Sequence, residues 1–138
     1  MPNFNDAEIT DIFVSQVTTP AVEDDAPNAP NGGPYDVTVE MVAGTGVQTE
    51  EYTLLISCAD ITTMAPAPGL VPTGPAFANP GKFGASAGWT PGAQFATFAA
   101  TATVGPGTSG NVYQYTASLL SANGQVVSIR QSDLFVLI

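Results

Sequence analysis

Residues 112–130 read VYQYTASLLSANGQVVSIR, and this stretch decides the fold. Residues 112–120 alternate apolar and polar side chains with a period of two, which is the pattern of a half-buried β-strand. Asn123-Gly124 then marks a tight turn, because both residue types tolerate the left-handed conformation that hairpins need. A two-residue Asn-Gly loop would pair Leu120 with Val127 and put Leu119 opposite Ser128. A three-residue loop with Gly124 in the left-handed position matches the apolar faces better, since it pairs Leu119 with Val127 and Ala117 with Ile129. The stretch therefore predicts an antiparallel hairpin with Val127 and Ile129 turned toward the core.

The same period recurs along the chain and predicts further strands over residues 9–17, 35–43, 52–60 and 95–104. The second of these is expected to bury its odd-numbered side chains and to expose Asp36, Thr38 and Glu40. The phase of the first is ambiguous. Beyond Arg130 the apolar phase flips to Leu134, Val136 and Ile138, and a bulge near 132–133 would explain the flip.

Short strands with turn signals between them, and no amphipathic helix, predict an all-β fold. We expect a single antiparallel β-sandwich over residues 1–138, with an immunoglobulin-like Greek key and a jelly roll as the alternative. Two long connections stand out: an acidic loop over 18–34, rich in Pro, Asn and Gly, and a Pro-, Gly- and Ala-rich loop over 64–94. Loops of that length are usually functional or disordered.

The C-terminal part carries a resemblance to known domains. The strand YQYTASLL at 113–120, the hairpin at Asn123-Gly124 and the closing LFVL at 134–137 resemble the last two strands of immunoglobulin-like and fibronectin-type-III-like domains. The cysteine pair of antibody-type domains is absent, because Cys58 has no second cysteine, and Trp89 follows Cys58 instead of lying between two cysteines. The resemblance implies a sandwich and no particular activity.

Charge divides the chain unequally. The formal net charge is −10, from 12 Asp+Glu against 2 Lys+Arg. All the charged residues in 1–51 are acidic, whereas in the rest of the chain the acidic and basic residues cancel. Because the chain has no basic patch to contact phosphates, we do not expect it to bind nucleic acid. Depletion of charge is typical of the core of a protein–protein interface. We therefore expect one acidic, solvated surface and one neutral surface available to a partner, the alternative being a compositional bias.

Location is left open by the sequence. The N-terminus has neither the basic nor the apolar segment of a secretory signal, and no apolar run approaches the ~18 residues of a membrane span. The expectation is no membrane association, with a virion or another assembled particle favoured.

The matches to catalytic motifs lack the residues or the following helix that their chemistry requires, so we expect that the protein is not an enzyme. The chain has no His, and the G-x-S-x-G match at 84–88 has neither a base nor a following helix. The G-x-G-x-x-G match at 105–110 precedes a strand, so it predicts a hairpin loop instead of a phosphate cradle. Glu40, Glu50 and Glu51 offer paired carboxylates, but no aromatic cleft accompanies them. No catalytic residue is predicted.

Two sets of residues remain as binding candidates. Phe77, Phe83 and Trp89 form a candidate partner-binding surface, because aromatic side chains dominate interface energetics; the alternative is a loop that covers the core. Glu23, Asp24 and Asp25 form a candidate calcium site, since calcium takes several carboxylate oxygens; the alternative is a solvated acidic loop, and otherwise no cofactor is expected.

These observations lead to one functional hypothesis and two alternatives. The first is a non-enzymatic structural or interaction protein that binds protein partners or copies of itself in an assembly, such as a virion (capsid decoration, fibre or tail) or a filament. The second is a carbohydrate- or other ligand-binding module that uses the Trp89 loop. The third is a small enzyme, which would require an open cavity lined by Tyr113 or Tyr115 and a carboxylate.

Overall fold

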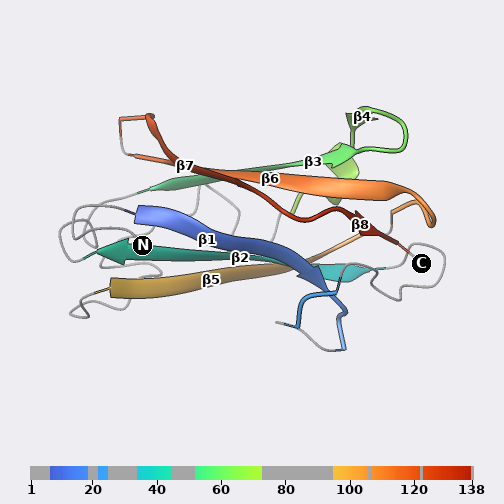
Figure 1. Cartoon of the computed structure of the whole chain (residues 1–138), viewed down its shortest axis with the longest axis horizontal. Coiled ribbons are helices and arrows are strands. Elements are labelled where there is room, and N and C mark those ends of the chain that lie inside the picture. The colour runs from blue at the N-terminus through green and yellow to red at the C-terminus, as the bar shows by residue number, and fades with distance from the viewer. Residues whose placement is uncertain are drawn as a thin grey trace.

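Two antiparallel sheets pack face to face in the computed structural model, which confirms the predicted antiparallel β-sandwich (Figure 1). The structure describes residues 7–18, 22–24, 34–44, 52–72, 95–105, 107–121 and 123–137, with the backbone alone for 95–99. Sheet A has the order β1-β2-β5, from β1 (Ala7–Ser15), β2 (Tyr35–Gly44) and β5 (Phe95–Val104). Sheet B has the order β4-β3-β6-β7, from β3 (Thr53–Asp60), β4 (Ala65–Pro66), β6 (Val112–Leu120) and β7 (Val126–Gln131), with β8 (Phe135–Val136) also paired to β6.

An aromatic cluster holds the two sheets together. Tyr35 of β2 and Tyr115 of β6 are fully buried, and their hydroxyl oxygens lie 2.7 Å apart. The Tyr115 hydroxyl donates to the carbonyl of Leu70 (2.6 Å), in the 3₁₀ turn η2 (Pro68–Leu70). Phe135 stacks on Tyr115 with ring centroids 5.5 Å apart. Because buried hydroxyls need partners, this chain of hydrogen bonds fixes both sheets and η2 to one another.

The ambiguous phase of the first strand is resolved by a bulge. The register of β1 on β2 shifts between Ile9 and Asp11. Ile9 therefore shares the inner face with Ile12 and Val14, whereas Phe13 lies on the outer face. A continuous alternation over 9–17 would have placed Ile9 beside Phe13, so the bulge corrects that assignment.

Asp36 and Thr38 correct the prediction that the even-numbered residues of β2 face solvent. Both lie on the outer face of sheet A, yet both are buried, and Glu40 alone of the three is exposed. Thr103 Oγ1 of β5 donates to Asp36 Oδ1 (2.5 Å), and the hydroxyls of Thr38 and Thr101 lie 3.0 Å apart. These cross-strand hydrogen bonds give the buried side chains of Asp36 and Thr38 their partners.

The hairpin from β6 to β7 has a different register from the predicted one. Gly124 does adopt the left-handed conformation, with φ +79°. However, Ser128 pairs with Leu119 and Ile129 with Ser118, because the register shifts between Leu119 and Leu120. Ile129 therefore lies on the outer face of sheet B instead of in the core.

The end of the chain also differs from the prediction. Phe135 and Leu137 are buried, whereas Leu134 is exposed. The reason is Ser132, which leaves the strand to bond the backbone of Tyr115 in both directions: its N–H donates to the carbonyl (2.9 Å) and its Oγ accepts the N–H (2.9 Å). Residues 132–134 are thus a connection between β7 and β8, and not a bulge within one strand.

The glycine-rich loop at 105–110 joins β5 of sheet A to β6 of sheet B, so the prediction of a hairpin loop is wrong. A strand follows it, as expected. Gly107 packs tightly there, since a Cβ at this position would lie 2.5 Å from Cδ1 of Leu137. A side chain at this position would therefore require the buried Leu137 to shift.

Candidate functional site

The outer face of sheet B is the surface that the strand registers leave open. Three strands build it, and their pairing sets three rows across the sheet. The rows are Thr53–Leu120–Val126, Leu55–Ser118–Ile129 and Ser57–Thr116–Gln131. We call this surface the B face. It continues along β3 and β6 to Ala59 and Gln114.

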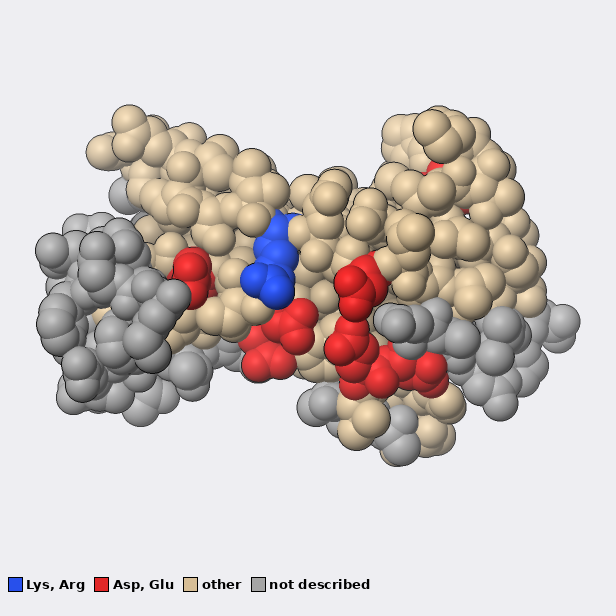
Figure 2. Space-filling model, viewed as in Figure 1, with Lys and Arg blue, Asp and Glu red and all other residues tan. Residues whose placement is uncertain are grey.

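Large apolar side chains lie exposed on the B face. Leu55 is 52% exposed and Ile129 is 62% exposed, and Val126 and Val127 beside them are also exposed. None of the residues in the three rows carries a charge, and Arg130 alternates to the other side of β7. Figure 2 shows the contrast: Asp and Glu gather in the lower half, over sheet A and the segment after β1, while the upper half over sheet B is almost free of them. The B face thus combines exposed apolar side chains with small polar ones and carries no charge in its three rows, and exposed apolar side chains gathered on one face indicate an interaction site.

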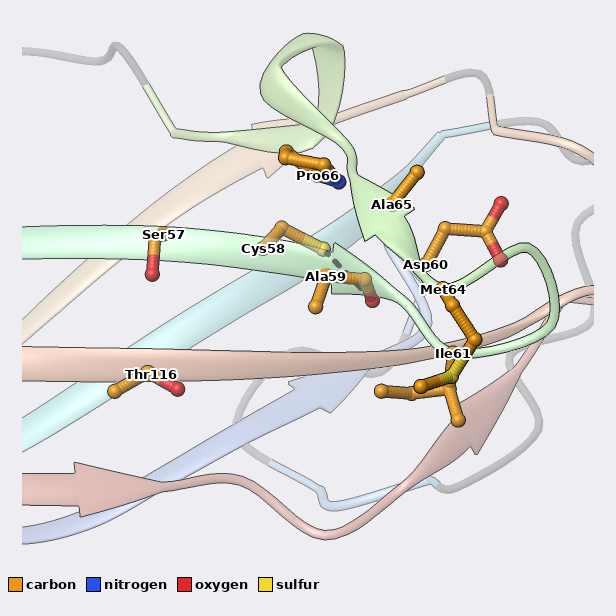
Figure 3. Close-up of a pocket in the computed structure, with 9 residues that line it drawn as sticks. All are labelled: Ser57, Cys58, Ala59, Asp60, Ile61, Met64, Ala65, Pro66 and Thr116. Carbon is orange, nitrogen blue, oxygen red and sulfur yellow. Dashed lines mark hydrogen bonds between the residues drawn. The ribbon is translucent and has the colours of Figure 1, made fainter.

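Raised segments bound the B face at both ends. The β6–β7 hairpin stands above sheet B at one end and the β3–β4 turn at the other, and the outline of the molecule dips between them (Figures 1 and 2). At the β3–β4 end the dip becomes a groove of about 470 Å³. Figure 3 shows its lining, which includes Ser57, Ala59, Ile61, Met64, Pro66 and Thr116. The B face is therefore hollowed and not flat.

Met64 forms the rim of this groove in a strained conformation. Its φ is +57°, in the left-handed region that side chains with a Cβ disfavour, and it is 84% exposed. Strain of this kind, of order 1–3 kcal/mol, persists only where the surrounding structure imposes it, and it is concentrated at functional sites. The turn thus holds an apolar side chain out into solvent at an energetic cost.

Asp60 anchors that turn. Its carboxylate accepts hydrogen bonds from the Thr63 N–H (3.1 Å) and from Asn111 Nδ2 (2.9 Å). Desolvation raises the pKa of Asp60, but these hydrogen bonds outweigh it, so the pKa lies below the usual value. The one carboxylate at the groove is therefore engaged within the chain.

Cys58 also lines the groove, but its side chain is buried. It pairs with Tyr115 across the sheet, and its Sγ lies 4.0 Å from the Ala59 carbonyl oxygen (Figure 3). Burial raises the pKa of the Cys58 thiol to about 12, although the hydrogen bond with Tyr115 lowers it. The thiol is thus a small apolar core group in practice.

A second hollow of about 350 Å³ includes Asp60 and Tyr113 in its lining, which is the combination that the enzyme alternative required. The Tyr113 hydroxyl accepts the Thr108 N–H (3.0 Å) and donates to the Thr108 carbonyl (3.5 Å). With the Asp60 carboxylate bonded to Thr63 and Asn111, both groups serve to hold loops. The hollow gives little support to a catalytic pair.

The residues proposed from the sequence are mostly not placed. Phe77, Phe83, Trp89 and Asp25 lie outside the described residues, as do the 84–88 motif and Glu50 and Glu51. Asp24 Oδ2 accepts a hydrogen bond from Gln16 Nε2 (2.9 Å), and Glu23 is exposed. Within the described part of the chain, no three His, Cys, Asp or Glu side chains gather as a metal site would require. The calcium site therefore stays a prediction.

Sequence reasoning missed two exposed apolar residues, Ile129 on the B face and Met64 at the rim of its groove. The signal for Ile129 was the second possible hairpin register, which places Leu119 opposite Ser128. No pattern in the sequence indicates the left-handed conformation of Met64.

Comparison with known proteins supports the architecture. The fold is similar to that in the crystal structure of a Niemann-Pick type C2 protein from the Japanese carpenter ant, with a TM-score of 0.50 and 8% sequence identity over 99% of this chain and 96% of that one. Identity this low shows a shared β-sandwich fold alone. No protein-family model matches the chain, and no curated protein matches it. Among the described residues, no helix has the length and apolarity needed to cross a bilayer.

Proposed function

We propose that this chain is a non-enzymatic interaction protein that works in an assembly and binds its protein partner on the B face. The observation that supports this most is that Leu55 and Ile129 stay exposed on a hollowed face whose three rows carry no charge, although the chain as a whole is acidic. Exposed apolar side chains on a sheet cost stability and solubility unless a partner covers them.

The strained rim supports the same proposal. Met64 projects from a turn that Asp60 and Thr63 hold in place, and methionine is a side chain that adapts to varied binding surfaces. A virion or filament is the setting that we propose for such an assembly. The finer relationship to immunoglobulin-like domains belongs to the proposal too, and it rests on the C-terminal strands.

Site-specific photo-cross-linking tests this function. A photoreactive phenylalanine analogue replaces Ile129 on the B face or, as a matched control, Val22 in the segment after β1, which is 61% exposed. We expect a discrete protein adduct from position 129 and little from position 22. Equal labelling at both positions, or none at position 129 in the cells that make the chain, would contradict the proposal.

A further inference from the structure

We infer that the occupant of the B face is a second copy of this chain, packed across a two-fold axis with the B faces in contact. This inference rests on the proposed function and names its partner. Two observations support it, the placement of charge and the shape of the face, and the size of the face sets the strength that we expect.

Charge placement is the first observation. A chain with net charge −10 repels its own copies unless the acids lie far from the contact. In the described residues, Glu8, Asp11 and Glu40 belong to sheet A, and the three rows of the B face have no charge. Asp60 lies at the groove at one end of the face, where hydrogen bonds from Thr63 and Asn111 hold its carboxylate. Sheets pack ~10 Å apart, so two copies joined by their B faces would hold their A sheets roughly 30 Å apart. That is several times the ~8 Å Debye length at physiological salt, so the repulsion is largely screened.

The placement of charge also limits the kind of partner that can bind the B face. A basic partner would be drawn to the acids of sheet A, and the B face offers it no charge to bind. A partner for the B face must itself present an uncharged apolar surface. A second copy presents such a surface, and a two-fold arrangement makes each row of one copy available to the other.

Shape is the second observation. The B face is raised at the two strand ends and open at the sides (Figures 1 and 2). Two such saddles fit when one is turned about a right angle to the other, so that the raised ends of each straddle the sides of its partner. Sheets are known to pack face to face at near 90°. In this arrangement Met64 on the raised turn contacts the partner copy.

Size sets the strength that we expect. Three strands ~4.8 Å apart and seven residues at ~3.3 Å each give a face of roughly 20 Å by 15 Å. The raised ends add to it, but the total falls below the roughly 1,200–2,000 Å² of standard-size interfaces, in the range of weak and transient contacts. We therefore expect a weak dimer that dissociates on dilution, with a dissociation constant on the order of micromolar.

Sedimentation of the full chain over a concentration series tests the inference. We expect the average mass to rise from monomer to dimer between low and high micromolar concentration. Ile129→Asp should weaken dimerisation at least about tenfold, because each copy buries an unpaired carboxylate. Val22→Asp adds the same charge at a position of equal exposure on the opposite side, and it should leave the dimer unchanged. Circular dichroism verifies that both variants fold.

A charge pair tests the two-fold geometry. Ser118 lies on the central strand β6 between Leu55 and Ile129, near where the axis must pass. Ser118→Asp and Ser118→Lys should each be monomeric, and an equimolar mixture should regain the dimer. A wild-type chain that stays monomeric at the highest concentration, a dimer that Ile129→Asp leaves intact, or a mixture that fails to associate would overturn the inference. If the cross-link from position 129 joins a different protein, the inference fails while the proposed function stands.

Discussion

The two outer faces of the sandwich start from the same alternation of side chains and end in opposite states. On sheet A, the outward residues Phe13 and Asp36 are only 5% and 6% exposed, and polar side chains bond across the strands. Residues 22–24 lie beside this face, where the Asp24 N–H donates to the carbonyl of Val14 (2.9 Å). On sheet B, outward Leu55 and Ile129 are open to solvent.

This difference reverses the usual relation between polarity and exposure. On the outer side of sheet A, Phe13, Asp36 and Thr38 are buried although Glu40, Thr101 and Thr103 stay exposed. On the outer side of sheet B, leucine, isoleucine and valine side chains are open. The buried side chains of Asp36 and Thr38 are tolerated because they are hydrogen-bonded, and open apolar groups are tolerated where they serve binding. The comparison therefore locates the binding surface by what the chain leaves uncovered.

Thiol labelling should give the largest contrast between the faces. In a Cys58→Ala background, Ser57→Cys on the B face should react as an exposed thiol, and Thr38→Cys on sheet A should react slowly. Native Cys58, whose pKa is raised from 9.0 to about 12 by burial, should have about a thousandfold less thiolate at pH 8 than an ordinary cysteine. Its rate should climb tenfold per pH unit beyond the point where Ser57→Cys levels off. Rapid labelling of Thr38→Cys would show that sheet A is open.

Truncation of apolar side chains should give the second-largest contrast, as different losses of unfolding free energy on the two faces. Phe13→Ala removes a buried ring from the outer side of sheet A and should lower the free energy of unfolding by about 3 kcal/mol. Leu55→Ala removes a half-exposed side chain from the B face and should cost under about 1 kcal/mol at monomer concentrations. Chemical denaturation of dilute protein measures both values. Equal losses would remove the distinction between a covered and an open face.

Hydroxyl removal should give a smaller difference of the same sign. Thr103→Val takes away the donor to the buried Asp36 carboxylate, and we expect a loss of about 1–3 kcal/mol in unfolding free energy. Ser118→Val is its counterpart on the B face, where valine suits a strand and no buried group loses a partner, so stability should be unchanged or slightly higher. Chemical denaturation measures the unfolding free energy of both variants. If Thr103→Val left the unfolding free energy unchanged, water would have to reach Asp36 in place of the lost hydroxyl.

The sequence predicts those elements in which local periodicity and burial coincide. Strands β5 and β6 have the predicted bounds, and β2 extends one residue further, to Gly44. The buried Tyr113 and Tyr115 follow from alternation alone, as do the exposed Leu55 and Ser57.

The failures have non-local causes. Asp36 is buried with a hydrogen bond from Thr103, which is far away in sequence. Ile129 faces outward because of a register shift at the hairpin and because Ser132 bonds to Tyr115. Two registers were compatible with the local pattern, and the apolar match favoured the wrong one. The candidate site was therefore hidden by the assumption that apolar side chains face the core.

The smallest expected effect concerns the strained rim, and it distinguishes binding from folding most sharply. Met64→Gly relieves the left-handed backbone strain, worth about 1–2 kcal/mol, but adds freedom to the unfolded chain, so unfolding free energy should stay level or rise by up to about 1 kcal/mol. The same change removes an exposed apolar side chain from the raised end of the B face, and dimerisation should weaken a few-fold. Met64→Asn, which also tolerates this conformation, should behave alike. If both variants gained stability and kept full dimerisation, the strain at Met64 would have no role in binding, and the contact would lie nearer the Leu55–Ser118–Ile129 row.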